Sequence, residues 1–443
     1  MHPHPACGGW RHCATKLAML YERWRQVAHD FKNEIALYDL ATGERWSFAQ
    51  LLAESNTLST APIIFPEGNG PQFIFSVLQG WRSSKIICPL GTGNLAPSFA
   101  ELPINCAHLK FSTTGDSARF ISFTAEQLAT DVANIVATMP LQTDAPNLGV
   151  ISLAHSYGFS NLVLPLLLHG IPLALAGSAS PESVLRTEKQ IEKMTLPAVP
   201  AFWQTWLEED AIPKNIQLAI SATAPLPLEL EREIFNKCGI KVHNFYQAAE
   251  CGGIAYDRSE KPRSDARFVG GPLENVQVGE NENGCLEVSG GAVGAGYYPE
   301  PNKALANGRF LTKNLAVVRD ENIYLLGRMA DQITVAGRKI SPEVIEAALQ
   351  DHPEVADTLV FGVPDEIGSN ETIVACIAVR GRINGEVLKE FLLKKLPAWK
   401  VPREWWFVDS LPTSEGERRS RAECRENYLR AKATAATRSW AHS

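Results

Sequence analysis

The sequence is short of the features that mark membrane, secreted and nucleic-acid-binding proteins. Its longest apolar runs, such as residues 162–168, are too short to span a bilayer. A formal net charge of -7 argues against a dedicated nucleic-acid or anionic-membrane partner. The nine cysteines form no CxxC pair, so neither a zinc site nor a disulfide framework is indicated. We therefore expect a cytoplasmic protein without a membrane span.

The start of the chain holds a loose group of potential metal ligands. Cys7 and Cys13 lie near His2, His4 and His12, but their spacing matches no familiar metal site. The stretch also lacks the basic start and apolar core of a secretory signal. A disordered leader is the favoured interpretation of this stretch, and a metal site is the alternative.

The length and pattern of the remaining chain predict an α/β protein. With 443 residues, 45% of them apolar, the chain can bury the cores of two or three domains. Strand-like and helix-like stretches alternate, with strands expected at 35–38, 63–65 and 85–90 and a helix at 73–79. Because this alternation is typical of βαβ units, we expect parallel sheet.

The most distinctive stretch is residues 327–346, GRMADQITVAGRKISPEVIE. Residues 332–336 read as a strand, and Gly337 permits a tight bend after it. Ser341 then suits the N-cap of a helix whose first turn contains Pro342 and Glu343. The pattern predicts strand, turn and helix in succession.

The ordered run GR…DQI-x-V-x-G-R-K-I-x-P-x-x-I-E resembles the junction motif of the adenylate-forming superfamily, which includes acyl-CoA synthetases, aryl-CoA ligases and peptide-synthetase adenylation domains. The resemblance implies a large N-terminal domain of parallel and mixed sheets with a small β-barrel subdomain, and a small mobile α+β C-terminal domain. It places Ala330 at the hinge. The expected divisions are a leader over 1–16, a shortened AMP-binding domain over 17–329, a lid domain over 330–430 and a tail over 431–443.

Residues 110–119, KFSTTGDSAR, resemble the phosphate-binding loop of that family. Hydroxyls and a glycine on a turn suit close contacts with phosphate oxygens. Ala118 stands where the family has lysine, with Arg119 beside it. The resemblance implies that the phosphate contacts are Thr113, Thr114, Gly115 and Arg119.

The run NFYQAAE, residues 244–250, resembles the family motif N-x-Y-G-x-T-E. The resemblance implies that Asn244 lies at the nucleotide, that Tyr246 stacks on adenine and that Glu250 holds Mg²⁺. A hard cation that bridges phosphates needs carboxylate oxygen, which fits Glu250. Ala249 replaces a threonine and removes one hydroxyl contact.

The acid pocket is predicted from three further segments. ISLAHSYGF, residues 151–159, resembles the family's strand-His-x-Tyr-Gly segment, which implies that His155 lies beside the substrate carboxylate and gates its pocket. The turn at Ala224 and Pro225 resembles "SGGAPL" and implies one side of the adenine and acyl pocket, although Ala222 and Thr223 replace its glycines. The predicted lining, which favours an aryl acid, is Tyr157, Phe159, Trp203 (a core residue in the alternative interpretation) and Phe245.

Nucleotide contacts are also implied near and beyond the hinge. FLTKN places Asn314 where the family has a ribose-binding aspartate, and the hinge motif adds Arg328, Gly337 and Lys339. The run LPTSEGERR, residues 411–419, resembles the family's catalytic-lysine loop, but its lysine position holds a glutamate. Arg418, or its neighbour Arg419, is the predicted substitute.

The resemblance implies activation of a small carboxylic acid by ATP and Mg²⁺ to an acyl-adenylate. A phosphopantetheine thiol of coenzyme A or of an acyl carrier protein then accepts the acyl group. The alternative is a catalytically degenerate acyl- or nucleotide-binding protein of the same fold. Changes that weaken phosphate or ribose contacts favour that alternative, and they lie at Ala118, Ala249, Asn314 and Glu417.

Overall fold

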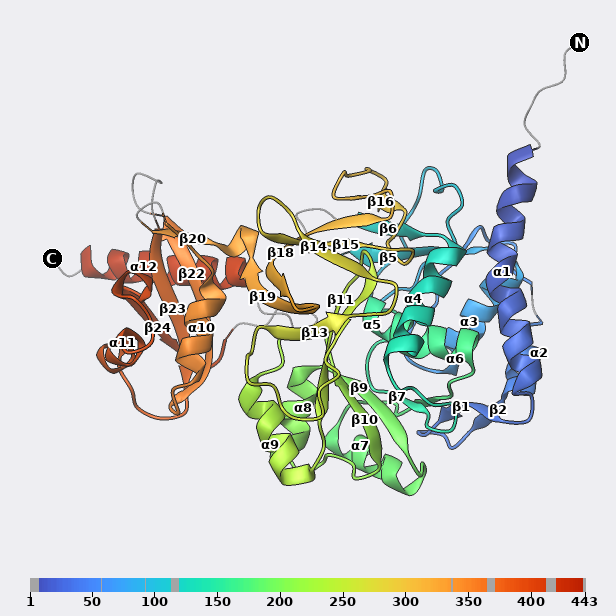
Figure 1. The fold of residues 1–443 in the computed structure, drawn as a ribbon, viewed down its shortest axis with the longest axis horizontal. Coiled ribbons are helices and arrows are strands. Elements are labelled where there is room, and N and C mark those ends of the chain that lie inside the picture. The colour runs from blue at the N-terminus through green and yellow to red at the C-terminus, as the bar shows by residue number, and fades with distance from the viewer. Residues whose placement is uncertain are drawn as a thin grey trace, which may run out of the picture. The chain divides into compact units, whose positions relative to one another are not determined.

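The computed structural model describes residues 8–56, 58–91, 93–112, 119–335, 338–364, 371–411 and 420–440. The chain forms two compact units (Figure 1). The large unit spans 1–279, 287–312 and 318–323, and the small unit spans 280–286, 313–317 and 324–443. The division crosses β14 (Gln277–Glu280), β15 (Cys285–Ser289), β18 (Arg309–Arg319) and β19 (Asn322–Arg328). It therefore falls a few residues before the predicted boundary at Ala330.

The main sheet of the large unit has a parallel centre. Its parallel strands are β1 (Ile35–Asp39), β7 (Asn147–Gly149), β8 (Leu173–Leu175), β9 (Met194–Ala198), β10 (Ile216–Ser221) and β11 (Val242–Ala248). The antiparallel strands β2 (Arg45–Ser47), β12 (Gly252–Tyr256) and β13 (Phe268–Pro272) extend it. These strands confirm the predicted α/β class.

A second, five-stranded sheet has the order β16-β6-β5-β4-β3. Its strands are β3 (Ile63–Ile64), β4 (Ile86–Ile87), β5 (His108–Ser112), β6 (Arg119–Phe123) and β16 (Gly296–Tyr298). The strands β3 and β4 are parallel, and β5 and β6 are antiparallel. Residues 113–118, between β5 and β6, lie outside the described residues.

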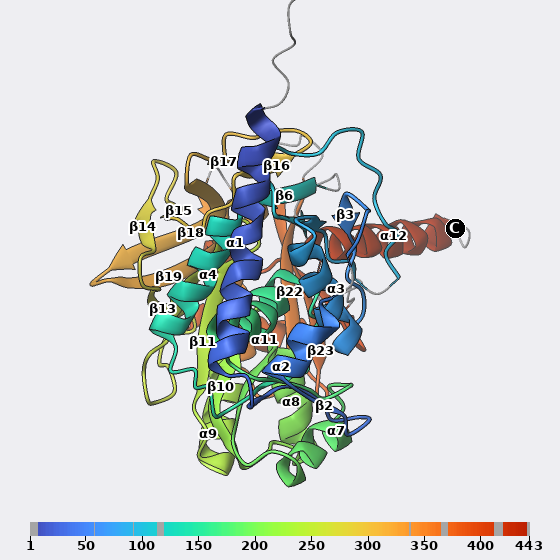
Figure 2. The ribbon, with the colours of Figure 1, turned by 90° about the vertical axis from the view of Figure 1, so that its right-hand side faces the viewer.

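Helices pack on both sheets and begin at recognisable signals. They are α1 (Gly8–Asp30), α2 (Phe48–Glu54), α3 (Pro71–Arg82), α4 (Ala125–Thr138), α5 (Ser156–Gly158), α6 (Leu164–His169), α7 (Pro181–Arg186), α8 (Pro200–Glu208) and α9 (Leu228–Cys238). Capping boxes at Ser47 and Thr124 satisfy the first amides of α2 and α4. Helix α1 contacts α2, α3, α4 and α6 (Figure 2). It begins inside the predicted leader, of which residues 1–7 lie outside the described residues.

The small unit contains a two-stranded sheet, β20-β21, and a three-stranded sheet, β22-β23-β24, with helices on both faces of the latter. It contains β20 (Ile333–Val335), β21 (Arg338–Ile340), α10 (Pro342–Gln350), β22 (Val355–Pro364), β23 (Glu371–Val379), α11 (Gly385–Leu393), β24 (Glu404–Val408) and α12 (Arg421–Trp440). One apolar cluster joins the sheet to α10 and α11, and another joins it to α12. Helix α12 continues through residues predicted as the tail.

Residues 327–346 depart from the prediction in one detail. The strand does not lead through a turn directly into the helix, because β20 pairs with β21 as a hairpin first. Ser341 occupies the N-cap position of α10, but its side chain makes no capping hydrogen bond. Among the helices that the structure describes, none combines the length and apolarity needed to cross a membrane.

Candidate functional site

Glu250 lies buried just after β11, with 5% of its surface exposed. Its Oε1 accepts a hydrogen bond of 3.0 Å from the hydroxyl of Tyr297. Its carbonyl accepts one of 2.8 Å from the amide of Gly294. A Cβ at Gly294 would lie 3.1 Å from that carbonyl oxygen and 3.2 Å from Cζ of Phe123, so the close approach favours glycine. The Tyr297 bond thus holds the carboxylate, and the Gly294 contact holds the backbone of Glu250.

Tyr297 connects Glu250 to the strand that follows the predicted phosphate loop. The guanidinium of Arg119, the first residue of β6, lies 5.9 Å from the centre of the Tyr297 ring. Burial and the charge of Glu250 raise the pKa of Tyr297, so its hydroxyl keeps the proton that it donates. The predicted contacts Thr113, Thr114 and Gly115 lie outside the described residues.

The strand β11 positions the remaining residues of the NFYQAAE run. Asn244 is buried and lies opposite Ser221 of the parallel strand β10. The next residue, Phe245, is also buried, whereas Tyr246 is half-buried. Successive side chains of a strand point to opposite faces, so Tyr246 shares its face of the sheet with Asn244 and Phe245 lies on the other.

His155 and Tyr157 lie at the start of α5. His155 is exposed at the N-cap, where its Nδ1 accepts a hydrogen bond of 3.3 Å from the amide of Tyr157. Tyr157 is 1% exposed, and its ring centre lies 6.0 Å from that of Phe245. Its buried hydroxyl has no hydrogen-bond partner among the described residues. Burial raises the pKa of Tyr157 well above its ordinary value, so the hydroxyl remains a donor.

The turn between β10 and α9 is exposed at Ala224 and Pro225. The preceding residue, Thr223, has a φ of 74°. A β-branched residue is uncommon in this left-handed region, which glycine adopts readily. The turn therefore keeps a glycine-like backbone although its sequence has lost the glycine.

Phe159 and Trp203 are fully buried and belong to the core of the large unit. The ring of Phe159 lies 4.2 Å from that of His108. The indole N–H of Trp203 donates a hydrogen bond of 3.3 Å to the carbonyl of Ile220, and its ring packs at 5.3 Å against Trp206. These contacts favour the core interpretation of Trp203 and leave Tyr157 and Phe245 as the central pair of the candidate acid pocket.

Three predicted nucleotide contacts belong to the small unit. Asn314 is half-buried on β18, Arg328 is exposed at the end of β19, and Lys339 is exposed on β21, opposite Thr334. Gly337 and Arg418 lie outside the described residues, as do Glu417 and Arg419. The described contacts thus join candidates within the large unit only.

A metal ion would have one carboxylate to bind at this site. Nowhere in the described ranges do three or more His, Cys, Asp or Glu side chains gather as a metal site. Mg²⁺ is commonly held by one or two carboxylates, substrate phosphates and water. A buried, hydrogen-bonded Glu250 suits an ion that arrives with a nucleotide.

Sequence reasoning missed Tyr297 as a member of the site. It lies in the Gly-rich segment before the hinge motif, far along the chain from Glu250. Its partner becomes visible only when β16 pairs with β6 and so brings the two segments together. No local pattern distinguishes Tyr297 from the adjacent Tyr298.

Two family models match the chain. Residues 118–298 match the AMP-binding enzyme family, and residues 344–417 match the AMP-binding enzyme C-terminal domain. An oxalate–CoA ligase of Arabidopsis thaliana is 28% identical over 426 residues, covering 88% of this chain and 82% of the relative. A feruloyl-CoA synthase of an Amycolatopsis species is 29% identical over 68% of this chain and 65% of the relative.

Solved structures share the fold. ATP-bound MatB from Rhodopseudomonas palustris superposes with a TM-score of 0.81 at 20% identity, covering 93% of this chain and 99% of that one. The o-succinylbenzoate CoA synthetase of Bacillus subtilis, in complex with its acyl-adenylate, gives 0.78 at 18% identity, with coverage of 90% and 96%. The likeness extends over both units.

Proposed function

Because this chain belongs to the adenylate-forming superfamily of AMP-dependent synthetases and ligases, we propose that it activates a small carboxylic acid with ATP and transfers the acyl group to coenzyme A. In the first step an oxygen of the acid attacks the α-phosphorus of ATP, and pyrophosphate leaves. In the second step the thiolate sulfur attacks the acyl carbon, and AMP leaves. The first step is needed because a carboxylate is a poor electrophile until its oxygen becomes part of a leaving group.

The buried position of Glu250 is the observation that carries this proposal. A carboxylate costs free energy to bury unless charge or hydrogen bonding compensates it. Here the Tyr297 hydroxyl donates one bond of 3.0 Å to Oε1, and a carboxylate is the type of oxygen ligand that Mg²⁺ prefers. Mg²⁺, when bound with ATP, would reduce the charge on the phosphates.

The neighbouring residues of β11 supply the nucleotide side of the site. The half-buried ring of Tyr246 offers a face for adenine, and the exposed turn at Ala224 and Pro225 is the proposed opposite wall. Arg119 provides a cation beside Tyr297, next to the predicted phosphate loop. Asn314, Arg328 and Lys339 are the proposed contributions of the small unit.

Tyr157 and Phe245 define the proposed acid pocket. Both rings are buried, and the Tyr157 hydroxyl is a donor without a partner among the described residues. An acid with a flat apolar body and a polar group that accepts this hydrogen bond would fit such a pair. His155 is the proposed gate, because it is exposed and fixed at the N-cap of the same helix.

Coenzyme A is the proposed acceptor because the two relatives that align over most of this chain are a CoA ligase and a CoA synthase by name. A carrier-protein phosphopantetheine has the same thiol and remains the second candidate. Parallel assays with coenzyme A and with a phosphopantetheinylated carrier protein distinguish the two. Faster acyl transfer to the carrier would reassign the acceptor without changing the activation step.

Residues 411–419 are expected to act in the adenylation step and not in the thiol-transfer step. If Arg418 replaces the missing lysine, Arg418→Ala slows adenylation but leaves thiol transfer from supplied acyl-adenylate intact. The loop serves only the first step in this proposal because the small domain presents different faces for the two steps. Full adenylation by both Arg418→Ala and Arg419→Ala would remove the arginines from that role.

The test is an acid screen with ATP, Mg²⁺ and coenzyme A, with AMP and acyl-CoA measured by mass spectrometry. Glu250→Gln should lower MgATP affinity by about tenfold or more, because it removes the charge that binds the cation. Glu260→Gln, at an exposed position of the same unit, is the matched control and should behave like the wild type. A wild-type protein that binds acid or nucleotide but forms neither product would be a binding protein of this fold.

A further inference from the structure

Asp131 lies buried between two segments that carry the candidate site. It projects from α4 and is 2% exposed. Its Oδ2 accepts a hydrogen bond of 2.6 Å from the hydroxyl of Ser160, and its Oδ1 accepts one of 3.1 Å from the amide of Gly253. Ser160 is in the π-helical turn η1 (Phe159–Val163), which continues the His155 segment. Gly253 follows Glu250 by three residues, so one carboxylate connects both segments.

The turn after Glu250 fits closely against this carboxylate. Gly252 has a φ of 70°, and a Cβ there would lie 2.0 Å from Oδ1 of Asp131. No side chain fits in that space. The backbone that leads away from Glu250 is therefore in direct contact with α4, and Asp131 determines how closely it approaches.

Lys110 brings a third segment to the same place. It lies on β5, three residues before the predicted phosphate contact Thr113, and is 5% exposed. Its Nζ lies 4.3 Å from the centre of the Phe123 ring and has no hydrogen-bond partner among the described residues. Burial lowers the pKa of Lys110, and the charge of Asp131 is the largest influence in the opposite direction. The negative charge of Asp131 therefore favours the protonated form of the Lys110 amino group.

A purely structural role is the competing interpretation, and α4 itself offers the comparison. Asn134 is on the same helix and is also 2% exposed. Its side chain hydrogen-bonds at 3.3 Å to Asn275, which is not a candidate site residue. Two side chains of equal burial on one helix therefore differ in whether they contact segments of the site.

We propose that Asp131 is a positioning residue, which holds the Glu250 turn and the His155 segment in fixed relation. Its side chain is not assigned a contact with substrate. The catalytic consequence rests on the proposed function, whereas the link between the segments does not. A small displacement of positioned groups lowers the rate because the reacting atoms no longer meet at the required distance.

Hydrogen exchange of the full chain tests the link without any ligand. Asp131→Ala should speed amide exchange at Gly253 and across residues 156–163 by about tenfold or more, because both hydrogen bonds are lost. Asp131→Asn keeps an acceptor and nearly the same shape, so it should restore most of the protection. Asn134→Ala is the matched control and should leave both segments at the wild-type rate.

Enzyme kinetics test the consequence. Asp131→Ala should lower kcat by about 10- to 100-fold, whereas Asn134→Ala should stay within about twofold of the wild type. If the wild type forms no acyl-adenylate, the proposed function fails, and the exchange experiment still decides the positioning role. Unchanged exchange at both segments in Asp131→Ala, or equal loosening by Asn134→Ala, would overturn the inference.

A second variant covers the case in which Asp131→Ala does not fold. Ser160→Ala removes only the bond to η1. Exchange should then increase across residues 156–163 while Gly253 stays protected. Equal acceleration at Gly253 would contradict two separate bonds to one carboxylate.

Discussion

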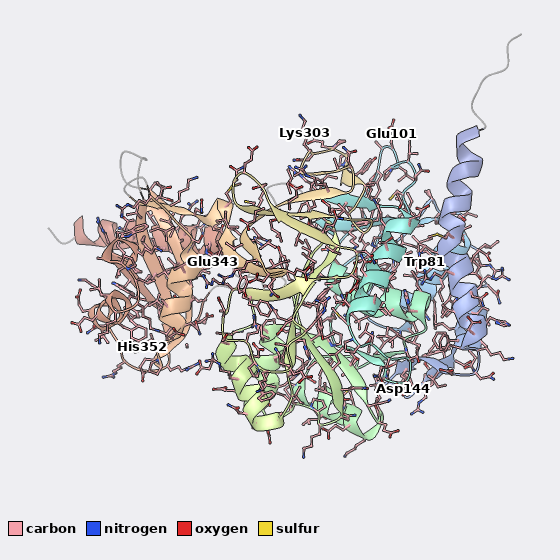
Figure 3. All side chains as sticks on the ribbon, in the orientation of Figure 1. Trp81, Glu101, Asp144, Lys303, Glu343 and His352 are labelled. Atoms are coloured by element: carbon pink, nitrogen blue, oxygen red, sulfur yellow. The ribbon has the colours of Figure 1, made fainter. Side chains whose placement is uncertain are left out.

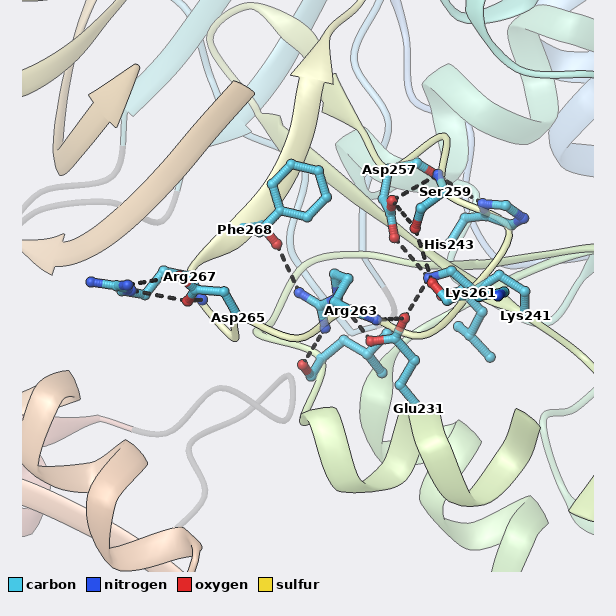
Figure 4. Close-up of polar contacts among 12 residues, drawn as sticks. Glu231, Lys241, His243, Asp257, Ser259, Lys261, Arg263, Asp265, Arg267 and Phe268 are labelled. Carbon is cyan, nitrogen blue, oxygen red and sulfur yellow. Dashed lines mark hydrogen bonds and ion pairs between the residues drawn. The ribbon is translucent and has the colours of Figure 1, made fainter. Parts of the chain in front are cut away.

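The two units differ in the ratio of acidic to basic side chains in their buried ion pairs. In the large unit, Glu231 and Asp257 are matched by Lys241 and Arg263, and all four side chains are less than a tenth exposed (Figure 4). In the small unit, Arg421 forms ion pairs with three carboxylates, at distances of 2.7 to 3.0 Å. These three are Asp331, Glu343 and Glu346, of which Glu343 is at the first turn of α10 (Figure 3).

The difference in charge ratio appears in the pKa values. Burial works against the charge of Asp257, but Lys241 and Ser259 hold its pKa below the ordinary value. Burial raises the pKa of Glu346 to about 7, because one guanidinium shared among three carboxylates does not offset it. The comparison teaches that the ion-pair partners of a buried carboxylate, as well as its burial, set the direction of its pKa shift.

Each arrangement suits its place in the proposed site. Arg263 donates to the carbonyls of Leu226 and Phe268 as well as to Glu231, so the balanced network secures the turn at Ala224. Asp331 directly follows the predicted hinge position Ala330, so Arg421 ties the hinge segment to the rest of the small unit. In the network of the large unit, the buried acidic and basic side chains are therefore equal in number. In the small unit, three carboxylates pair with Arg421, and the raised pKa of Glu346 makes their ionisation depend on pH.

The largest expected effect is in the matched network. Arg263→Met should destabilise the large unit by about 3–5 kcal/mol, because it leaves Glu231 buried with half of its cationic partners. Urea unfolding followed by peptide-resolved hydrogen exchange measures the change. Arg267→Met is the control: its ion pair with Asp265 is 55% exposed on the arginine side and should contribute at most about 1 kcal/mol. Equal losses of stability in the two variants would contradict the claim that the buried ion pairs contribute more than the exposed one.

The pH dependence should have opposite signs in the two units. The pKa of Glu346 is about 7 in the folded protein, above its unfolded value of 4.5. The protonated carboxyl therefore contributes its full stabilisation of the small unit below pH 4.5. About 3 kcal/mol of that stability is lost as the pH rises to 7. In the large unit, burial lowers the pKa of His108 and His243, so stability there is lost as the pH falls below 6.5.

Hydrogen exchange at several pH values measures how the stability of each unit changes with pH, because each unit is followed through its own peptides. Glu346→Gln should flatten the slope of the small unit and leave that of the large unit unchanged. Parallel slopes in both units would show that the charge ratio around Arg421 does not control the response.

The smallest expected effect concerns the strained turn of the large unit. Thr223→Gly should stabilise it by about 1 kcal/mol, because glycine adopts the observed φ of 74° without a side-chain clash. Ala222→Gly, at the neighbouring position without this φ, should not stabilise. Thermal unfolding of both variants measures the difference, and a loss of stability in Thr223→Gly would show that the threonine side chain offsets its strain.

The sequence predicted what local patterns encode. Alternating strands and helices predicted the α/β class, and the hinge motif predicted the family, both of which are confirmed. The carboxylate of Glu250 followed from its motif, and its structural setting as a buried, hydrogen-bonded group is consistent with the predicted metal contact, which stays a prediction.

The contacts between distant segments were beyond sequence reasoning. Tyr297 meets Glu250 only through the pairing of β16 with β6, and Asp131 meets Gly253 only when α4 packs beside β12. The sequence left Trp203 as either a pocket residue or a core residue, because an aromatic side chain on a helix suits both positions. Its full burial and its hydrogen bond to Ile220 favour the core interpretation. The hairpin partner β21 was missed because three residues carry too little strand pattern.

The measurement that tests the central claim most directly is acid-dependent exchange of labelled pyrophosphate into ATP by the wild-type protein. The exchange reports acyl-adenylate formation alone, without the thiol step. We predict exchange with at least one small, flat carboxylic acid, its dependence on Mg²⁺, and its loss in Glu250→Gln but not in Glu260→Gln. If a broad acid panel gives no exchange while the same preparation binds ATP, the chain does not activate acids, and the account is wrong.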